Sequence, residues 1–196
     1  MNTVAPTPVQ QPNAARHRYG CAAARARQSG VTLVESLMVL AVTAVVLGTA
    51  VPSFEAARER RQVEGAAAQL ETDIHHARSM AVARSATLRM SFQHGAAGSC
   101  YVVHSGNAGD CQCAADGSAV CRPGAQSFQT VYWPAGSAVR VVANSRSLVF
   151  DETRGTVTPT ATIQVHGRQH TIRQIVNVMG RVRSCSPSAL PGYRAC

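Results

Sequence analysis

Residues 27–52 read RQSGVTLVESLMVLAVTAVVLGTAVP, and this stretch decides how the chain is built. Its centre, Val31 to Val51, is 21 residues long, and Glu35 is the only charged residue within it. A helix of that length spans a hydrocarbon core of ~30 Å, because each residue adds ~1.5 Å along the axis. The sequence therefore predicts that residues 31–52 form a membrane-spanning helix.

The residues before this stretch form a basic leader, residues 1–30. The leader has no acidic residue, and its basic residues are four arginines, Arg16, Arg18, Arg25 and Arg27. Arginines that flank an apolar segment stay in the cytoplasm, so we expect the rest of the chain to be a periplasmic head held by a single pass through the inner membrane. An ordinary secretory signal has its small residues after the apolar run, whereas Ser29 and Gly30 precede it here.

The residues around the apolar run resemble the processing and assembly signature of type IV prepilins and type II secretion pseudopilins. The shared features are Gly30 at the cut, Glu35 five residues into the mature chain, the uninterrupted apolar helix and Pro52. The resemblance implies that a prepilin peptidase cleaves between Gly30 and Val31 and methylates the new amino terminus at Val31. Valine at that position departs from the phenylalanine or methionine that is commoner in the family. The implied partners are the prepilin peptidase, the inner membrane and other pilins or minor pilins.

Glu35 is the residue for which the resemblance and physical chemistry predict a role in assembly. An unpaired carboxylate in lipid is costly, so an intramembrane acid normally has a partner. The nearest candidate is the α-amino group of Val31, from the same chain or from a neighbouring subunit. Pairing between subunits would bring a new subunit into register with the last one added. In the alternative, Glu35 lies near the headgroups and favours a helix N-terminus.

After Pro52 the pattern predicts that the helix continues as an amphipathic half, residues 53–84. Its apolar residues recur at alternating steps of four and three, at Val63, Ala67, Leu70, Ile74, Ala77 and Ala81. In residues 85–196 the pattern changes to short β runs separated by Gly, Pro, Asn and Asp turns. We expect an α+β fold, in which the long N-terminal helix packs on an antiparallel β-rich head of about six to eight strands.

A long helix followed by a β-rich head resembles the branch of the pilin superfamily that includes the pseudopilin GspH and the minor pilins FimT and FimU. The resemblance implies a FimT-like minor pilin that moves from the inner membrane into an extracellular type IV pilus. The alternative is the type II secretion pseudopilin H, a component of a short filament for protein export. The neighbouring genes, for pilus biogenesis or for secretion, would separate the two functions.

The cysteines predict disulfides. Six of the seven lie after the membrane segment, which is an even number in an exported head. A bridge between Cys185 and Cys196 would hold the proline-containing tail between them as a fixed loop. The other four, Cys100, Cys111, Cys113 and Cys121, have three possible pairings, of which the bond between Cys111 and Cys113 is disfavoured because its ring is strained.

The rival hypothesis for these cysteines is a zinc site that includes His94 or His104. The cysteine spacings match no common zinc knuckle, and the expected compartment oxidises thiols. We therefore predict no metal and no cofactor.

The last quarter of the chain is basic. No acidic residue follows Glu152, whereas six arginines do, Arg154, Arg168, Arg173, Arg181, Arg183 and Arg194. Within this segment Gly180-Arg181-Val182-Arg183 resembles the Gly-Arg-x-Arg motif of DNA-binding FimT proteins. In an extended strand the two arginines point to the same face about 6.6 to 7 Å apart, so each could hold a backbone phosphate.

The arginines predict non-specific DNA binding, and the resemblance to FimT proteins implies that this binding serves DNA uptake in natural transformation. Gly180 would permit a tight approach, and Tyr193 or Arg194 would add a stacking or an ionic contact. The alternative is a solvated basic edge that keeps a strand from aggregating.

No motif in the sequence predicts catalysis. The chain lacks a nucleophile elbow, a His-Glu-x-x-His helix, a paired acidic motif and a phosphate-cradling glycine loop. We expect no enzymatic activity.

Overall fold

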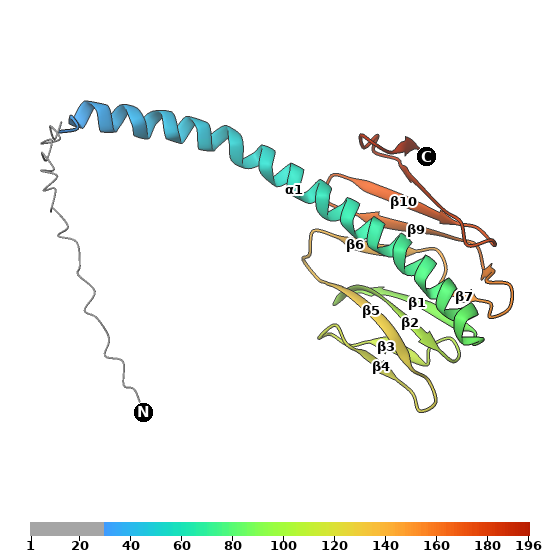
Figure 1. The fold of residues 1–196 in the computed structure, drawn as a ribbon. Coiled ribbons are helices and arrows are strands. Elements are labelled where there is room, and N and C mark those ends of the chain that lie inside the picture. The colour runs from blue at the N-terminus through green and yellow to red at the C-terminus, as the bar shows by residue number, and fades with distance from the viewer. Residues whose placement is uncertain (1–29) are drawn as a thin grey trace, which may run out of the picture. The chain divides into compact units, whose positions relative to one another are not determined.

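The structure is a computed structural model that describes residues 30–196, so the predicted leader up to Ser29 lies outside the described residues. The described chain is one helix followed by strands (Figure 1). The elements are α1 (Leu33–Arg84), β1 (Leu88–Gly95), β2 (Gly98–Ser105), β3 (Cys111–Cys113), β4 (Ala119–Cys121), β5 (Ser127–Pro134), β6 (Arg140–Ala143), β7 (Ser147–Phe150), β8 (Val157–Thr158), β9 (Ala161–His166), β10 (Thr171–Val176), β11 (Val182–Ser186) and β12 (Arg194–Ala195).

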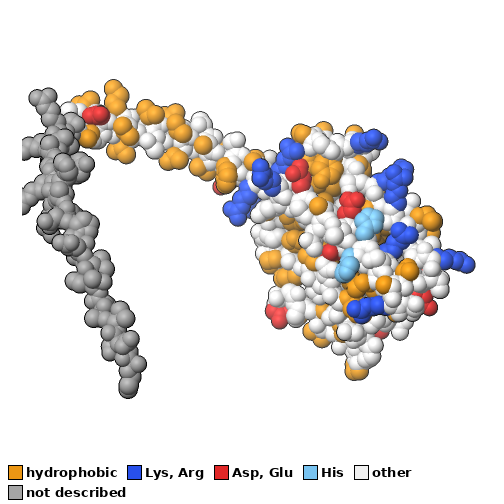
Figure 2. Space-filling model, in the orientation of Figure 1, with side chains coloured by type: hydrophobic (Ala, Val, Ile, Leu, Met, Phe, Trp, Pro, Cys, Tyr) orange, Lys and Arg blue, Asp and Glu red, His pale blue; other side chains and the backbone are white. Residues whose placement is uncertain are grey.

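Helix α1 begins at a cap that the sequence provides. The hydroxyl of Thr32 accepts the backbone N–H of Glu35 at 3.3 Å, which satisfies one of the free donors of the first turn. Pro52 lies inside the helix and has no N–H to offer the carbonyl of Gly48, yet the helix continues. An 18-residue window of α1 near its start has a mean hydropathy of 2.1 and no buried residue, so α1 is long and apolar enough to cross a membrane. Figure 2 shows hydrophobic side chains along this part of the helix.

The second half of α1 supplies one side of the hydrophobic core. All six residues of the predicted apolar stripe are buried, and they pack with residues of both large sheets, among them Leu88, Tyr101, Phe150, Ile163 and Ile172. Burial of each large aliphatic side chain contributes about 1.5–3 kcal/mol relative to exposure, so this stripe is a main reason that the helix remains on the head.

The head contains two five-stranded sheets and a two-stranded hairpin. The first sheet has the order β5-β2-β1-β7-β8, the second has the order β12-β11-β10-β9-β6, and β3 pairs with β4. All pairs are antiparallel except the short parallel pair of β11 and β12. Helix α1 lies against both large sheets (Figure 1). This arrangement confirms the predicted α+β fold.

The number of strands was wrong, because the described residues form twelve strands instead of six to eight. Four of the missed strands, β3, β4, β8 and β12, are only two or three residues long, which is too short for an alternating pattern to appear. The fifth, β11, has the sequence VRSCS, in which polar and small residues hide the alternation.

Two buried polar contacts attach α1 to the sheets. The hydroxyl of Tyr101 on β2 donates to the carboxylate of Asp73 at 2.5 Å, and the side-chain amide of Gln174 on β10 donates to the carbonyl of Ala67 at 2.7 Å. Burial, followed by the hydrogen bond and charge of Asp73, raises the pKa of Tyr101, so the phenol keeps its proton. Each sheet therefore has its own directional contact to the helix.

Candidate nucleic-acid interface and assembly residues

The second large sheet contains no acidic residue. Its five strands contain four arginines, Arg140, Arg173, Arg183 and Arg194, while every acidic residue of the chain lies in other elements. Side chains alternate along each strand, and Val141, Ile163, Val165, Ile172 and Val176 occupy the core. The intervening residues therefore form an outer face, which we call the basic face and define by the four arginines and His166.

The strand register places these arginines along the basic face. Arg173 is paired with Cys185, which is also paired with Arg194, and Arg183 is paired with Ile175 two residues further along β10. Arg140 on β6 is paired with His166 on β9, toward the other end of the sheet. Arg140, Arg183 and Arg194 are exposed and Arg173 is half-buried. The Nε atom of Arg173 is buried without a hydrogen-bond partner in the described structure, so it retains a free donor.

The sequence analysis missed Arg140. This residue precedes Asp151 and Glu152 in the chain, so it lies outside the acid-free segment that drew attention to the other arginines. Only the pairing of β6 with β9 brings it to the basic face. No local pattern could have shown this, because strand order is a property of the whole fold.

The Gly-Arg-x-Arg segment follows the tip of the β10–β11 hairpin. Arg181 and Arg183 are exposed, and Val182 is half-buried against the core. Gly180 is buried, has a φ of 72° and donates its N–H to the carbonyl of Asn177 at 2.9 Å. A Cβ at this position would lie 2.9 Å from Cδ of Arg78. Gly180 therefore serves the turn and its packing, and its surroundings give no support to a close approach by DNA.

Tyr193 does not lie with the arginines. Its ring is half-buried and packs against the hydrophobic core. Burial, then the negative charges of Glu64 and Glu71 on α1, raise the pKa of its hydroxyl. This packing gives no support to the expected stacking contribution of Tyr193, which stays a prediction. Arg194 is exposed on the edge strand β12.

His166 is affected by the positive charge of the basic face. Its pKa is lowered from the ordinary 6.5, first by burial and then by repulsion from Arg140 and Arg173. Its Nδ1 atom lies 3.2 Å from the hydroxyl of Thr171. The burial and the nearby positive charges thus favour the neutral imidazole of His166, and a bound anion would offset the effect of the charges.

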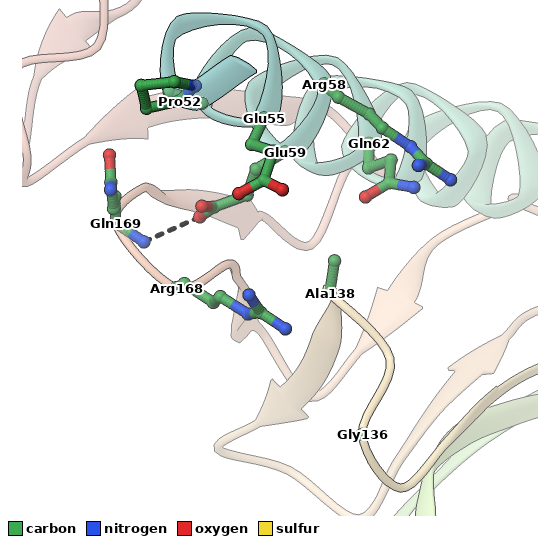
Figure 3. Close-up of a pocket in the computed structure, with 10 residues that line it drawn as sticks. Pro52, Glu55, Arg58, Glu59, Gln62, Gly136, Ala138, Arg168 and Gln169 are labelled. Atoms are coloured by element: carbon green, nitrogen blue, oxygen red, sulfur yellow. Dashed lines mark hydrogen bonds between the residues drawn. The ribbon is translucent and has the colours of Figure 1, made fainter. Parts of the chain in front are cut away.

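The β9–β10 turn is held under the helix next to a surface pocket (Figure 3). The backbone N–H of Gln169 donates to the buried carboxylate of Glu59 at 2.6 Å. A Cβ on Gly167 would lie 2.6 Å from the same carboxylate and 2.6 Å from Cγ2 of Val63, so a larger residue here would displace these side chains. Arg168 extends into the pocket below the helix in Figure 3. The hydrogen bond between Gln169 and Glu59 holds the turn between β9 and β10 against α1, at the end of the second sheet where His166 lies.

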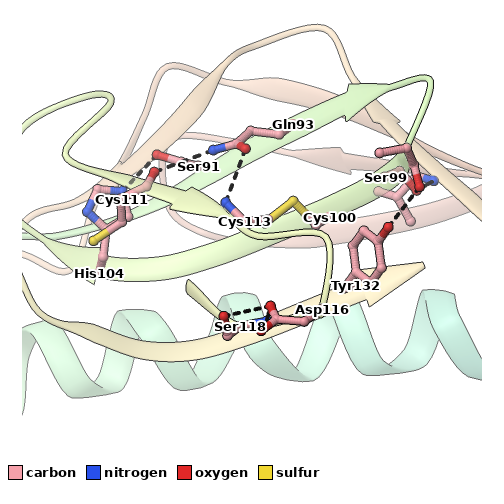
Figure 4. The surroundings of a disulfide bond; sticks show 12 residues. Ser91, Gln93, Ser99, Cys100, His104, Cys111, Cys113, Asp116, Ser118 and Tyr132 are labelled. Carbon is pink, nitrogen blue, oxygen red and sulfur yellow. Dashed lines mark hydrogen bonds between the residues drawn. A yellow bond between two sulfur atoms is a disulfide. The ribbon is translucent and has the colours of Figure 1, made fainter. Parts of the chain in front are cut away.

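The six cysteines of the head form three disulfides in the structure. Cys185 is bonded to Cys196, Cys100 to Cys113, and Cys111 to Cys121. The bond between Cys100 and Cys113 attaches the β3–β4 hairpin to the first sheet, where Gln93 on β1 also accepts the N–H of Cys113 at 3.2 Å (Figure 4). The bond between Cys111 and Cys121 links the two strands of the hairpin to each other. This is one of the pairings that the sequence left open.

The two histidines of the rival zinc hypothesis lie in different surroundings. His104 is fully buried, and its Nε2 atom is 2.8 Å from the hydroxyl of Ser91 while its Nδ1 atom is 2.8 Å from the carbonyl of Ser105. His94 is exposed on β1. Both nitrogens of His104 are therefore occupied by protein groups.

The residues predicted for processing and assembly lie at the start of the described chain. Gly30 and Val31 are exposed and precede α1, and Glu35 is in its first turn. In residues 30–196 of the single chain, no ion pair involves Glu35. The expected pairing of Glu35 with the amino group of Val31 therefore stays a prediction.

Comparison with known proteins identifies the family. A family model described as type II transport protein GspH matches residues 66–180, which is more than half of the chain. The chain belongs to the GspH family. A second model, the prokaryotic N-terminal methylation motif, matches residues 25–51. The motif implies processing by a prepilin peptidase, and membership of a pilin-like family implies assembly with other pilins.

Two further comparisons concern individual proteins. The crystal structure of the Pseudomonas aeruginosa type IV minor pilin FimU is similar to this GspH-family chain at 14% identity, with a TM-score of 0.49, over 69% of this chain and 96% of that one. No curated protein matches the chain.

The disulfides of this GspH-family head give a first prediction. The protein purified from an oxidising compartment should contain no free thiol among the six head cysteines, and replacing Cys185 and Cys196 with serine should lower the free energy of unfolding by about 2–3 kcal/mol. The reason is that the bridge closes a loop with a sequence separation of 11 residues. Non-reducing peptide mapping and denaturant unfolding measure the two quantities. Free thiols or bound zinc in stoichiometric amount would contradict this prediction.

Proposed function

We propose that this chain is a FimT-like minor pilin of a type IV pilus that binds DNA through its basic face and through Arg181, which directly precedes β11. The observation that carries the proposal is the second sheet, which has four arginines and no acidic residue. A surface of one sign attracts a polyanion over a distance, and arginine forks match phosphate oxygens. The binding is to the sugar–phosphate backbone, so it carries little sequence information.

The proposed path of the protein begins with its precursor. Prepilin peptidase removes residues 1–30 by cutting between Gly30 and Val31 and methylates Val31. The mature chain is held in the inner membrane by residues 31–52, with residues 53–196 in the periplasm. It then enters the filament through α1, where Glu35 pairs with the amino terminus of a neighbouring subunit. The head brings the basic face to the filament surface, where it captures DNA for uptake in natural transformation.

The test of DNA capture is a titration of the mature chain in detergent with duplex DNA at two salt concentrations. Replacing Arg181 and Arg183 with glutamine should weaken DNA binding about tenfold. It should also make the negative slope of log affinity against log salt concentration less steep by about 1.8, because two phosphate contacts are lost. The matched control replaces Arg58 and Arg61, two exposed arginines on α1, with glutamine and removes the same charge. If the wild type does not bind at low salt, or if the control loses as much affinity, the basic face is not the DNA site.

A second prediction concerns pH. DNA affinity should rise as the pH falls from about 7.5 to 5.5, because a phosphate near His166 offsets the repulsion by Arg140 and Arg173 that lowers its pKa. The pKa of His166 is then higher in the DNA-bound protein than in the free protein, so the protein takes up a proton when it binds DNA. Replacing His166 with glutamine should remove this part of the pH dependence. Affinities measured across this range for both proteins test the linkage, and an unchanged pH profile in the variant would contradict it.

The second candidate is the type II secretion pseudopilin H. It is favoured by the description of the matching family model, which names a type II transport protein. Deleting the gene distinguishes the candidates, since a pseudopilin is required for export of folded proteins and the proposed pilin for DNA uptake. In neither case do we expect catalysis. Turnover by the protein that disappears when one polar residue is replaced would contradict that expectation.

A further inference from the structure

The tip of the β10–β11 hairpin has two exposed hydrophobic side chains at its centre. Val178 is 45% exposed and Met179 is 63% exposed. The central positions of such a turn usually have polar residues or glycine, because these favour the turn and are well solvated. The fold gains little from two hydrophobic residues that face solvent, so their presence calls for another explanation.

The backbone of this tip is held firmly. The side-chain oxygen of Asn177 accepts the N–H of Arg181 at 2.9 Å, and the carbonyl of Val178 accepts the N–H of Val157 at 2.8 Å. On the other side of the turn, Gly180 is packed against Arg78 and Val157. The two hydrophobic side chains therefore project from a rigid support, and a partner would not have to order the loop on binding.

The charges next to the tip are positive. Arg181 and Arg183 follow it directly and are both exposed. Asp151 and Glu152, which lie between β7 and β8, are occupied by other groups: Asp151 accepts the N–H of Arg154 in its own turn at 2.7 Å, and Glu152 accepts the N–H of Thr87 at 2.9 Å. Within residues 30–196, the tip is thus a hydrophobic projection beside two guanidinium groups that form no ion pair.

We propose that Met179, supported by Val178, is a wedge that enters the base stack of DNA whose phosphates are held by Arg181 and Arg183. This inference rests on the proposed DNA binding and adds a preference for the form of DNA. Hydrophobic side chains that enter a base step partly unstack it, and the cost is lowest where a mismatch, a bulge or a flexible step has already weakened the stack. The expected ligand is a duplex with an interrupted or deformable stack.

A polyanion fits this surface better than a hydrophobic protein partner does. A protein that covered Met179 would also remove water from Arg181 and Arg183, and an unpaired buried charge costs several kcal/mol. DNA offers phosphates to the arginines and an apolar interior to the methionine at the same place. A flexible, unbranched side chain such as methionine also adapts to an irregular gap between bases.

The test compares two duplexes of equal length, one fully paired and one with a central two-base bulge, bound to the mature full chain in detergent. The wild type should bind the bulged duplex about tenfold more tightly, and Met179→Ser should bring the ratio close to one, with the affinity for paired DNA and the salt slope unchanged. The matched control is Val120→Ser on the β3–β4 hairpin, because Val120 is also 63% exposed and lies outside the basic face.

The outcomes separate the wedge from the proposed function. If the wild type binds both duplexes equally, or if Met179→Ser keeps the preference, the wedge is wrong while DNA binding itself stands. If the wild type binds neither duplex, both proposals fail. If Met179→Ser keeps the preference and instead lowers incorporation into filaments, the tip contacts another subunit, which also overturns the wedge.

Discussion

Replacing Glu35 with alanine is expected to lower the amount of the protein in filaments by about tenfold or more, with no change in the amount inserted in the membrane. Membrane insertion should be unaffected, because the replacement removes the only charge from residues 31–51 and makes this stretch more hydrophobic. In the assembly that we propose, incorporation depends on pairing of the carboxylate with an amino terminus, and alanine cannot form this pair. Immunoblots of sheared filaments and of carbonate-washed membranes measure the two quantities.

The matched control for this experiment is Glu55→Ala. Glu55 lies on the same helix three residues after Pro52 and is also exposed, so the change in charge is the same. Its replacement should leave incorporation unchanged. Normal incorporation of Glu35→Ala, or an equal loss in the control, would show that the carboxylate at position 35 has no special role in assembly.

Replacing Tyr101 with phenylalanine is expected to lower the free energy of unfolding by about 2–3 kcal/mol, because a buried hydrogen bond to a carboxylate is lost. Asp73 is only 4% exposed, and after the substitution its side chain retains only Gln69, whose amide lies 3.2 Å away. The protein has one tryptophan, Trp133, whose ring centroid is 5.7 Å from that of Tyr101, so denaturant unfolding can be followed by its fluorescence.

Tyr132→Phe is the comparison for this change. The hydroxyl of Tyr132 donates to the carbonyl of Ala97 at 2.7 Å, but this hydrogen bond is exposed, so its loss should cost less than about 1 kcal/mol. A double-mutant cycle with Asp73→Asn then isolates the coupling between Tyr101 and Asp73. Equal costs for the two tyrosine substitutions would mean that the buried contact contributes no more than an exposed one.

The sequence was most informative where a pattern is local. The steps of four and three in residues 63–81 predicted which side of the helix is buried, because a helix repeats every 3.6 residues. The longer strands also appeared as alternating runs. The match to the methylation motif covers the same residues that the processing signature occupies, from before Gly30 to Val51.

The features that the sequence did not reveal depend on contacts between distant segments. Arg140 belongs to the basic face only because β6 pairs with β9, and Tyr193 turns away from that face because the tail packs against α1. In the same way, the choice among the cysteine pairings depends on how the β3–β4 hairpin lies on the first sheet. Each of these follows from strand order and register, which no short stretch of residues specifies.

Four of the hydrogen bonds between α1 and the head have a mechanical consequence. Glu59, Ala67, Asp73 and Arg78 are spread over about five turns of the helix, and each is hydrogen-bonded to a different strand or turn. Tension along the helix axis therefore acts on all four contacts in shear, so they must break together and cannot be peeled off one at a time. A subunit pulled through its helix should slide within its filament before its head comes off the helix.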